Sequence, residues 1–285
     1  MAGFRVASVG RVGEDRRFDP NPVMMDEVKM ALELYNDGTH HCLLFQNLVT
    51  GEAVQANQVI ILDQGQAALL DPGGEMTFGP LRGALSAYLE PEGLDYVLAS
   101  HQDPDIISSL DLWLTETSCK IVIPAVWERF IPHFTHAGRL EDRVISVPDQ
   151  GLILSLGDGE LSLLPAHFLH AEGNFSFYDP TSRILFSGDI GANFPHSVLP
   201  QPVSTLAEIL PVMAPFHHRY MASGKVCRYW AEMVRELEVE TLVPQHGRYL
   251  QGRQVVDEFL DWLAGLECGI DLVGPNLYRL PRLEA

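Results

Sequence analysis

Histidine and aspartate alternate in one short stretch of the sequence, directly after an apolar run. The run is Tyr96-Val-Leu-Ala99, and Ser100-His-Gln-Asp-Pro-Asp-Ile106 follows it. Side chains at alternate positions of a tight turn can converge on one point at a sheet edge, and Pro104 stiffens this turn because it fixes its own φ angle. The turn therefore offers a preorganised imidazole and two carboxylates, which suit a metal ion. These side chains are His101, Asp103 and Asp105.

Three further segments carry histidine or aspartate after apolar runs. They are His167-Phe-Leu-His170, Ser187-Gly-Asp189 and Pro244-Gln-His-Gly247. Taken alone, Asp189 is explained equally well as a residue that closes a turn. His246 taken alone is explained as an ordinary loop histidine without a metal-binding role. Short loops after strands are, however, where a rigid scaffold holds functional side chains. The four segments together therefore favour a metal site.

The ligand types narrow the choice of metal. Three imidazoles and three carboxylates without a thiolate suit iron or manganese at least as well as zinc. A single catalytic zinc ion usually takes three protein ligands and a water, so six side chains fit two metals with a shared carboxylate better. His167 and His170 compete for one of the imidazole positions, and the spacing alone leaves both open.

Short runs rich in strand-forming residues alternate with turn signals through most of the sequence. The predicted strands are 42–49, 58–62, 67–71, 96–100, 120–123, 152–155, 160–164, 174–178 and 183–187. The helical periodicity predicts helices at 83–89, 106–115 and 255–266, and another that begins at Ser223. Two blocks of strands with accompanying helices predict an α/β fold, an αββα sandwich of two mixed sheets with helices outside.

Composition and charge exclude several classes of protein. Lys+Arg 19 against Asp+Glu 38 gives a net charge of −19 without a basic run, so nucleic acid and anionic membranes are poor partners. The apolar runs fall far short of the ~20 residues that span a bilayer. The N-terminus lacks the apolar core of a secretory signal, which predicts a cytoplasmic protein. The four cysteines have no close spacing and are predicted to be buried thiols.

No repeat, low-complexity tract or linker divides the sequence. We therefore expect one domain over residues 1–285, with a core at about 40–266.

The order of the motifs resembles the metallo-β-lactamase superfamily, and within it the di-iron branch of flavodiiron proteins and their oxygen-binding di-iron relatives. The matching pieces are HxDxD, FLHAEGNFSFYDP, ILFSGDIGA and PQHG, and the segment Phe216–Ala222 adds support. The resemblance extends from about Val59 to Leu250. It implies two iron ions joined by an oxo or hydroxo bridge, with zinc or manganese as alternatives. The implied ligands are His101, Asp103 and His170 for one ion, Asp105 and His246 for the other, and Asp189 for both.

Two positions depart from the pattern of the hydrolytic members, which read HxHxDH. Asp103 and Ile106 stand where those proteins have histidine. A carboxylate at the first position marks the iron branch, where it is more often glutamate. At the second position, Ile106 is expected to leave an open, apolar-sided coordination position for O₂. The resemblance also implies that His167 lies next to the ligands without binding a metal itself, and that Tyr220 lies near the di-iron pocket.

A flavodiiron protein continues into a flavodoxin domain that holds FMN. This sequence ends at Ala285, 35 residues after Leu250, so neither that domain nor FMN is expected. O₂ binding for sensing or carriage, with or without slow O₂ reduction, is therefore the leading functional prediction. The alternatives are an O₂ or NO reductase with a separate electron donor, and a dinuclear metallohydrolase. The resemblance also implies a homodimer and an electron-transfer or signalling partner.

Overall fold

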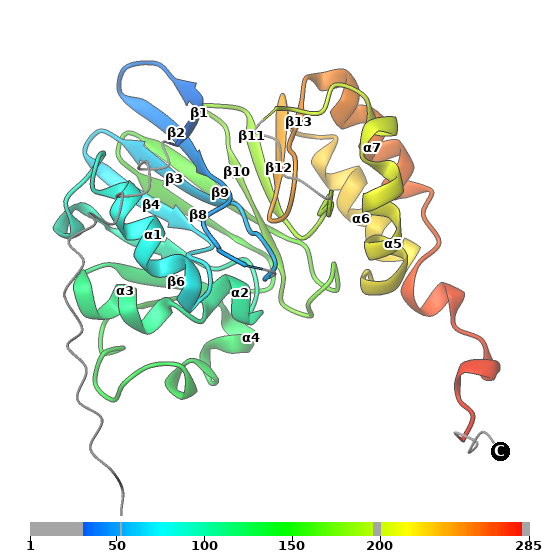
Figure 1. Cartoon of the computed structure of the whole chain (residues 1–285), viewed down its shortest axis with the longest axis horizontal. Coiled ribbons are helices and arrows are strands. Elements are labelled where there is room, and N and C mark those ends of the chain that lie inside the picture. The colour runs from blue at the N-terminus through cyan, green and yellow to red at the C-terminus, as the bar shows by residue number, and fades with distance from the viewer. Residues whose placement is uncertain (1–30, 52, 196–200, 281–285) are drawn as a thin grey trace, which may run out of the picture.

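The computed structural model describes residues 31–51, 53–195 and 201–280. The N-terminal stretch on which the cytoplasmic prediction rests lies outside these residues. Two β-sheets face each other, and helices cover the outer face of each sheet (Figure 1). The predicted αββα sandwich is confirmed.

The first sheet is mixed and has the strand order β1-β2-β3-β4-β5-β6-β7. Its first four strands pair antiparallel, and β4 to β7 pair parallel. The strands are β1 Leu32–Asn36, β2 His40–Phe45, β3 Gln58–Asp63, β4 Gln66–Leu70, β5 Tyr96–Leu98, β6 Lys120–Pro124 and β7 Val144–Val147.

The second sheet has the order β13-β12-β11-β10-β9-β8. All its pairs are antiparallel except β11 with β12, which run parallel and place Gly188 opposite Pro244. The strands are β8 Leu152–Leu156, β9 Gly159–Pro165, β10 Phe175–Asp179, β11 Ile184–Gly188, β12 Thr241–Pro244 and β13 Leu250–Gln251. The parallel pair matters for function because both of its strands end at the same edge.

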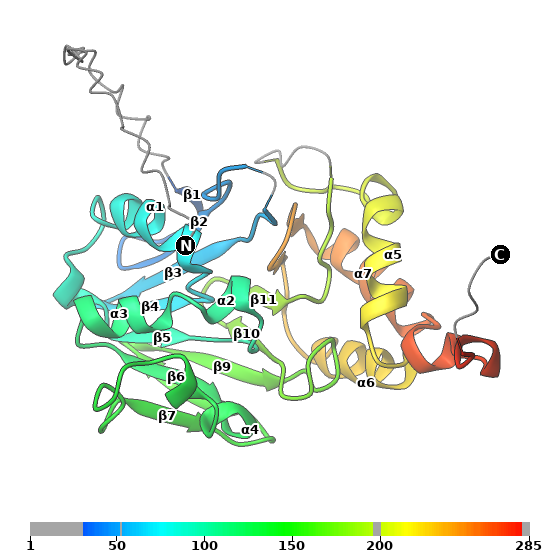
Figure 2. The ribbon, with the colours of Figure 1, turned by 60° about the horizontal axis from the view of Figure 1, so that its bottom comes forward.

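Three apolar clusters hold the layers together. One lies between the sheets and contains Phe175 and Phe177, and the other two lie under the outer helices. Figure 2 shows α1 to α3 on one side of the sandwich and α5 to α7 on the other. The helices are α1 Glu75–Leu85, α2 Pro104–Ile107, α3 Leu110–Glu116, α4 Ala125–Glu128, α5 Leu210–Tyr220, α6 Gly224–Val234 and α7 Arg253–Ala264. None of the helices in the described residues is long and apolar enough to cross a membrane.

Several predicted elements need correction. The helix predicted at 83–89 begins at Glu75, because α1 accommodates Pro80 in its interior, where proline usually breaks a helix. The helix predicted at 106–115 is two short helices, α2 and α3. The prediction of four buried thiols is confirmed.

Candidate metal centre

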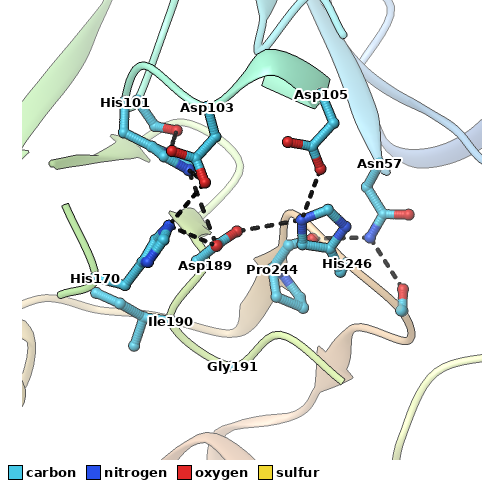
Figure 3. A network of polar contacts seen from close by, with 12 residues as sticks. Asn57, His101, Asp103, Asp105, His170, Asp189, Ile190, Gly191, Pro244 and His246 are labelled. Atoms are coloured by element: carbon cyan, nitrogen blue, oxygen red, sulfur yellow. Dashed lines mark hydrogen bonds and ion pairs between the residues drawn. The ribbon is translucent and has the colours of Figure 1, made fainter. Parts of the chain in front are cut away.

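The predicted ligands come from loops at one end of the sandwich. His101 follows β5 of the first sheet, and His170 lies in the loop before β10 of the second. Asp189 and His246 follow the parallel strands β11 and β12, so the pairing of Gly188 with Pro244 brings them side by side. Both sheets therefore contribute to one polar cluster (Figure 3).

One part of the cluster is a compact set of two imidazoles and two carboxylates. The ligand atoms of His101, Asp103 and His170 all lie within 4.8 Å of one another. Nε2 of His170 lies 3.1 Å from Asp103 Oδ2 and 3.4 Å from Asp189 Oδ2. Nε2 of His101 lies 3.9 Å from each of the same two oxygens.

The other part centres on His246. Its Nε2 lies 3.5 Å from Asp105 Oδ2 and 3.4 Å from Asp189 Oδ1. Asp189 therefore directs one oxygen to His246 and the other to the pair His101 and His170, and Figure 3 shows it between the two groups. A carboxylate placed in this way suits a ligand shared by two ions.

Two buried atoms test whether a metal fits. His101 Nε2 and Asp189 Oδ1 make no hydrogen bond, although the residues are only 1% and 3% exposed. Leaving such a buried polar atom without a partner costs about 1–3 kcal/mol. A cation beside His101 and a second cation between Asp189 Oδ1 and His246 would give both atoms a partner. The other ring nitrogen of His246, Nδ1, donates to Gln55 O at 2.7 Å, which directs Nε2 into the cluster. The residues present therefore fit a metal centre.

Electrostatic attraction between the histidines and the aspartates of the cluster shifts their pKa values and so determines their charges. Burial alone would raise the pKa of Asp189, but His246, His101 and His170 hold that pKa well below its ordinary value. The hydrogen bond from His170 lowers the pKa of Asp103. Burial opposes the charged form of His246, yet its contacts with Asp189 outweigh burial and raise its pKa to about 9. Asp189 and Asp103 consequently remain ionised and attract positive charge.

Two buried polar residues that the sequence analysis did not single out position the ligand loops. Asp71 Oδ1 accepts a hydrogen bond from the backbone N–H of Ser100 at 2.7 Å, beside His101. Burial raises the pKa of Asp71 to about 7. Asn57 Nδ2 donates to the carbonyl oxygens of Pro244 at 2.8 Å and Gly247 at 2.9 Å, on either side of His246. Asp71 directly follows an apolar strand, which was a usable signal, whereas nothing near Asn57 in the sequence indicates its role.

His217 is a third supporting residue, on α5. It is 0% exposed, its Nδ1 donates to Met213 O at 2.9 Å, and its Nε2 accepts the backbone N–H of Gly191 at 2.9 Å. These bonds fix a neutral tautomer, and burial lowers its pKa to about 4. His217 thereby holds the turn that follows Asp189.

We predict that His217 makes the protein sensitive to acid. The unfolded chain binds a proton at this histidine below about pH 6.5, whereas the folded chain does so only below about pH 4. The free energy of unfolding should therefore fall between these pH values, by at most roughly 3 kcal/mol from this group. In His217→Gln the side-chain amide oxygen can still accept the backbone N–H of Gly191, but it does not bind a proton in this pH range. The free energy of unfolding of this variant should therefore decrease less as the pH is lowered. Urea unfolding of metal-free protein at several pH values measures it, and equal slopes for the two proteins would contradict the prediction.

The remaining predicted site residues lie around the cluster. His167 donates Nε2–H to Asp149 O at 2.8 Å, so this nitrogen faces a neighbouring loop. Ile106 is 0% exposed and packs in the apolar cluster under α1 and α3. The open position expected beside Ile106 stays a prediction about the metal-loaded protein.

Aromatic rings flank the histidines of the cluster. Phe194 stacks on His246 with ring centroids 5.3 Å apart, and Phe216 lies 6.0 Å from His170. Tyr220 lies 5.7 Å from His170 and stacks on Phe216 at 4.7 Å. These rings give the cluster an apolar wall on the side of α5.

Comparison with known proteins identifies the family of this chain. A family model described as the ODP family beta lactamase matches residues 54–247. The chain belongs to this family. The resemblance to the metallo-β-lactamase superfamily and its di-iron branch is thereby confirmed.

Solved structures of similar fold agree with this family. "Peroxy diiron species of chemotaxis sensor ODP" is 39% identical, with a TM-score of 0.77 over 87% of this chain and 100% of that chain. The apo state of the chemotaxis sensor ODP from T. denticola is also 39% identical, with a TM-score of 0.78 over 87% of this chain and 98% of the other. A flavo di-iron protein mutant from Thermotoga maritima is 19% identical, with a TM-score of 0.67 over 82% of this chain and 60% of that chain, and shows the shared fold.

Curated relatives match over a shorter stretch. Uncharacterized protein MJ0732 of Methanocaldococcus jannaschii is 27% identical over 47% of this chain and 33% of its own length. Diflavin flavoprotein A 1 of Synechocystis is 27% identical over 46% of this chain and 22% of its own length. The chain therefore spans a third or less of these two relatives.

Proposed function

We propose that this protein is a non-haem di-iron protein that binds O₂ for sensing or carriage. The observation that carries the proposal is the position of Asp189, a buried residue whose two carboxylate oxygens face different histidines of the cluster. The similarity to a chemotaxis sensor with a peroxy di-iron species supports the choice of metal and ligand.

The chain's own residues hold the metals and control their surroundings. His101, Asp103 and His170 would hold one iron ion, Asp105 and His246 the other, and Asp189 both. When bound, ferrous ions supply the electrons and the coordination positions that O₂ requires. The three carboxylates, of which Asp189 is buried, offset part of the metal charge, and Asp71 and Asn57 keep the ligand loops in place. Phe194 and Phe216 limit the access of water to the ligands.

The finer features of the proposal follow the resemblance. They are a homodimer in the cytoplasm, a signalling or electron-transfer protein as partner, an oxo or hydroxo bridge between the irons, and no bound FMN. The net charge of −19 would favour a partner with a basic surface.

Metal analysis of protein prepared without air tests the proposal. We expect two irons per chain and a new charge-transfer band in the visible spectrum when O₂ is admitted. Slow O₂ consumption in the presence of a chemical reductant would be compatible with a sensor. Stoichiometric zinc, no colour change and turnover of a test ester would overturn the proposal in favour of a hydrolase. Rapid sustained reduction of O₂ or NO with an electron-donor protein would replace it with a reductase.

We predict that Phe216 protects the oxygenated centre. Phe216→Ala removes the ring that contacts both His170 and Tyr220, which opens the ligands to water. The O₂-dependent absorption band should then decay about tenfold faster, since an aromatic contact contributes about 0.5–1.5 kcal/mol. Tyr229→Ala is the control, because Tyr229 is 59% exposed on α6 and its ring contacts Lys225 instead of a predicted metal ligand. Equal decay in the two variants would contradict the prediction.

A further inference from the structure

A second cluster of metal-ligating side chains lies away from the candidate metal centre. His40 and Cys42 belong to the first three residues of β2, and Asp179 is the last residue of β10. Since His170 precedes β10, this strand runs from the metal centre to the second cluster at its other end. The three residues are 3%, 0% and 1% exposed.

The cluster joins the two sheets. His40 and Cys42 are two positions apart in a strand, so their side chains lie on the same face. Cys42 packs in the apolar cluster between the sheets, together with Phe177 of the second sheet. Asp179 comes from that second sheet, so the ligand atoms meet across the interface between the sheets.

The distances among the three ligand atoms suit a small divalent ion. His40 Nε2 lies 2.8 Å from Asp179 Oδ2, and Cys42 Sγ lies 3.3 Å from the same oxygen and 3.7 Å from the nitrogen. Tetrahedral zinc with ordinary bond lengths separates such ligand atoms by about 3.3 to 3.6 Å. The triangle is thus close to the required one, and only its nitrogen–oxygen edge must open by about half an ångström.

Neighbouring polar residues orient the side chains of this second cluster. His40 Nδ1 lies 3.4 Å from Asp63 Oδ1. The other oxygen of Asp63 accepts the backbone N–H groups of Asp158 and Gly159, each at 2.9 Å. A fixed carboxylate beside the free nitrogen of a histidine is the usual support of a metal-binding imidazole. Ser182 Oγ donates to Asp179 Oδ2 and so orients the second carboxylate.

We propose that His40, Cys42 and Asp179 form a second metal site, which binds one zinc-like divalent ion and ties the two sheets together. The mixture of sulfur, nitrogen and oxygen selects a borderline metal such as zinc, whereas the di-iron cluster has no sulfur ligand. A thiolate and a carboxylate match the charge of a dication. The proposal is independent of O₂ binding, because no residue is shared by the two sites.

Cobalt titration of the full chain tests the site. Co²⁺ is added without air to ferrous protein, and the near-ultraviolet thiolate-to-cobalt charge-transfer band is recorded. We expect the band to saturate at one equivalent, to disappear when Zn²⁺ is added, and to be absent in Cys42→Ser. Cys227→Ser is the matched control, because Cys227 is also a buried thiol, with its Sγ 3.7 Å from that of Cys268, and this variant should keep the band.

The variant Asp179→Asn tests the same site if Cys42→Ser does not fold. Asp179→Asn retains the thiol and should weaken cobalt binding at least tenfold. Zn²⁺ should also raise the melting temperature of the wild type more than that of Asp179→Asn. Absence of the band in wild-type protein, or its persistence in Cys42→Ser, would overturn the proposal and leave these residues as a hydrogen-bonded ion pair between the sheets. Iron content and O₂ response are measured on the same samples, so failure of the di-iron function is recognised separately.

Discussion

Asp189→Asn is expected to remove most of the iron from the protein. Asp189 is the only predicted ligand that faces both groups of the cluster, with Oδ2 3.4 Å from His170 Nε2 and Oδ1 3.4 Å from His246 Nε2. An amide carries no charge and offers a single good ligand oxygen, so one ion loses a bond and both ions lose the shared negative charge. Loss of an outer-shell partner already costs 10–100-fold in metal affinity, and loss of this residue should cost at least about 100-fold. Metal analysis should then show well below one iron per chain.

The control is an aspartate outside the cluster. Asp257 lies on α7, its side chain is 48% exposed, and it pairs with Arg253. Asp257→Asn should keep the full iron content and the O₂-dependent band. If Asp189→Asn also retained two irons, the shared-ligand role of Asp189 would be wrong.

Gly247→Ala is expected to be among the most destabilising single-methyl changes. Gly247 follows His246 and has a φ angle of +87°, and an added Cβ would lie 2.1 Å from the carbonyl oxygen of Asn193. Asn57 also binds the carbonyl of Gly247, so relief of the clash moves the loop that carries His246. We expect a loss of about 3 kcal/mol in the free energy of unfolding, together with a loss of iron. Chemical unfolding and metal analysis measure the two effects.

Gly65→Ala separates backbone strain from the clash. Gly65 has a similar φ angle of +81°, but nothing lies within 4 Å of an added Cβ. Its replacement should cost about 1 kcal/mol and leave the iron content unchanged. Equal losses in the two variants would show that the contact between Gly247 and Asn193 has no special cost.

The sequence revealed the parts of the site that depend on local spacing. His101, Asp103 and Asp105 occupy alternate positions of one turn, and Asp189 follows a recognisable strand, so their proximity could be predicted. The hydrogen bond from Asn57 to Pro244 O joins residues 187 positions apart, and spacing carries no information on such a contact. The contact of His40 with Asp179, 139 positions away, was hidden for the same reason. Helix α1 was misplaced because its burial against the first sheet outweighs the local effect of Pro80.

The parallel pairing of β11 with β12 has a consequence for how the protein is made. Asp189 and His246 meet only because Gly188 lies opposite Pro244, and β12 is among the last strands of the chain. A ribosome-bound chain that has exposed only the HxDxD turn offers a few flexible ligands, which hold a metal weakly. The complete centre arises after the C-terminal strands have joined the second sheet. Tight metal binding therefore requires that folding is complete. The rate of metal uptake during refolding should equal the rate at which β12 pairs with β11.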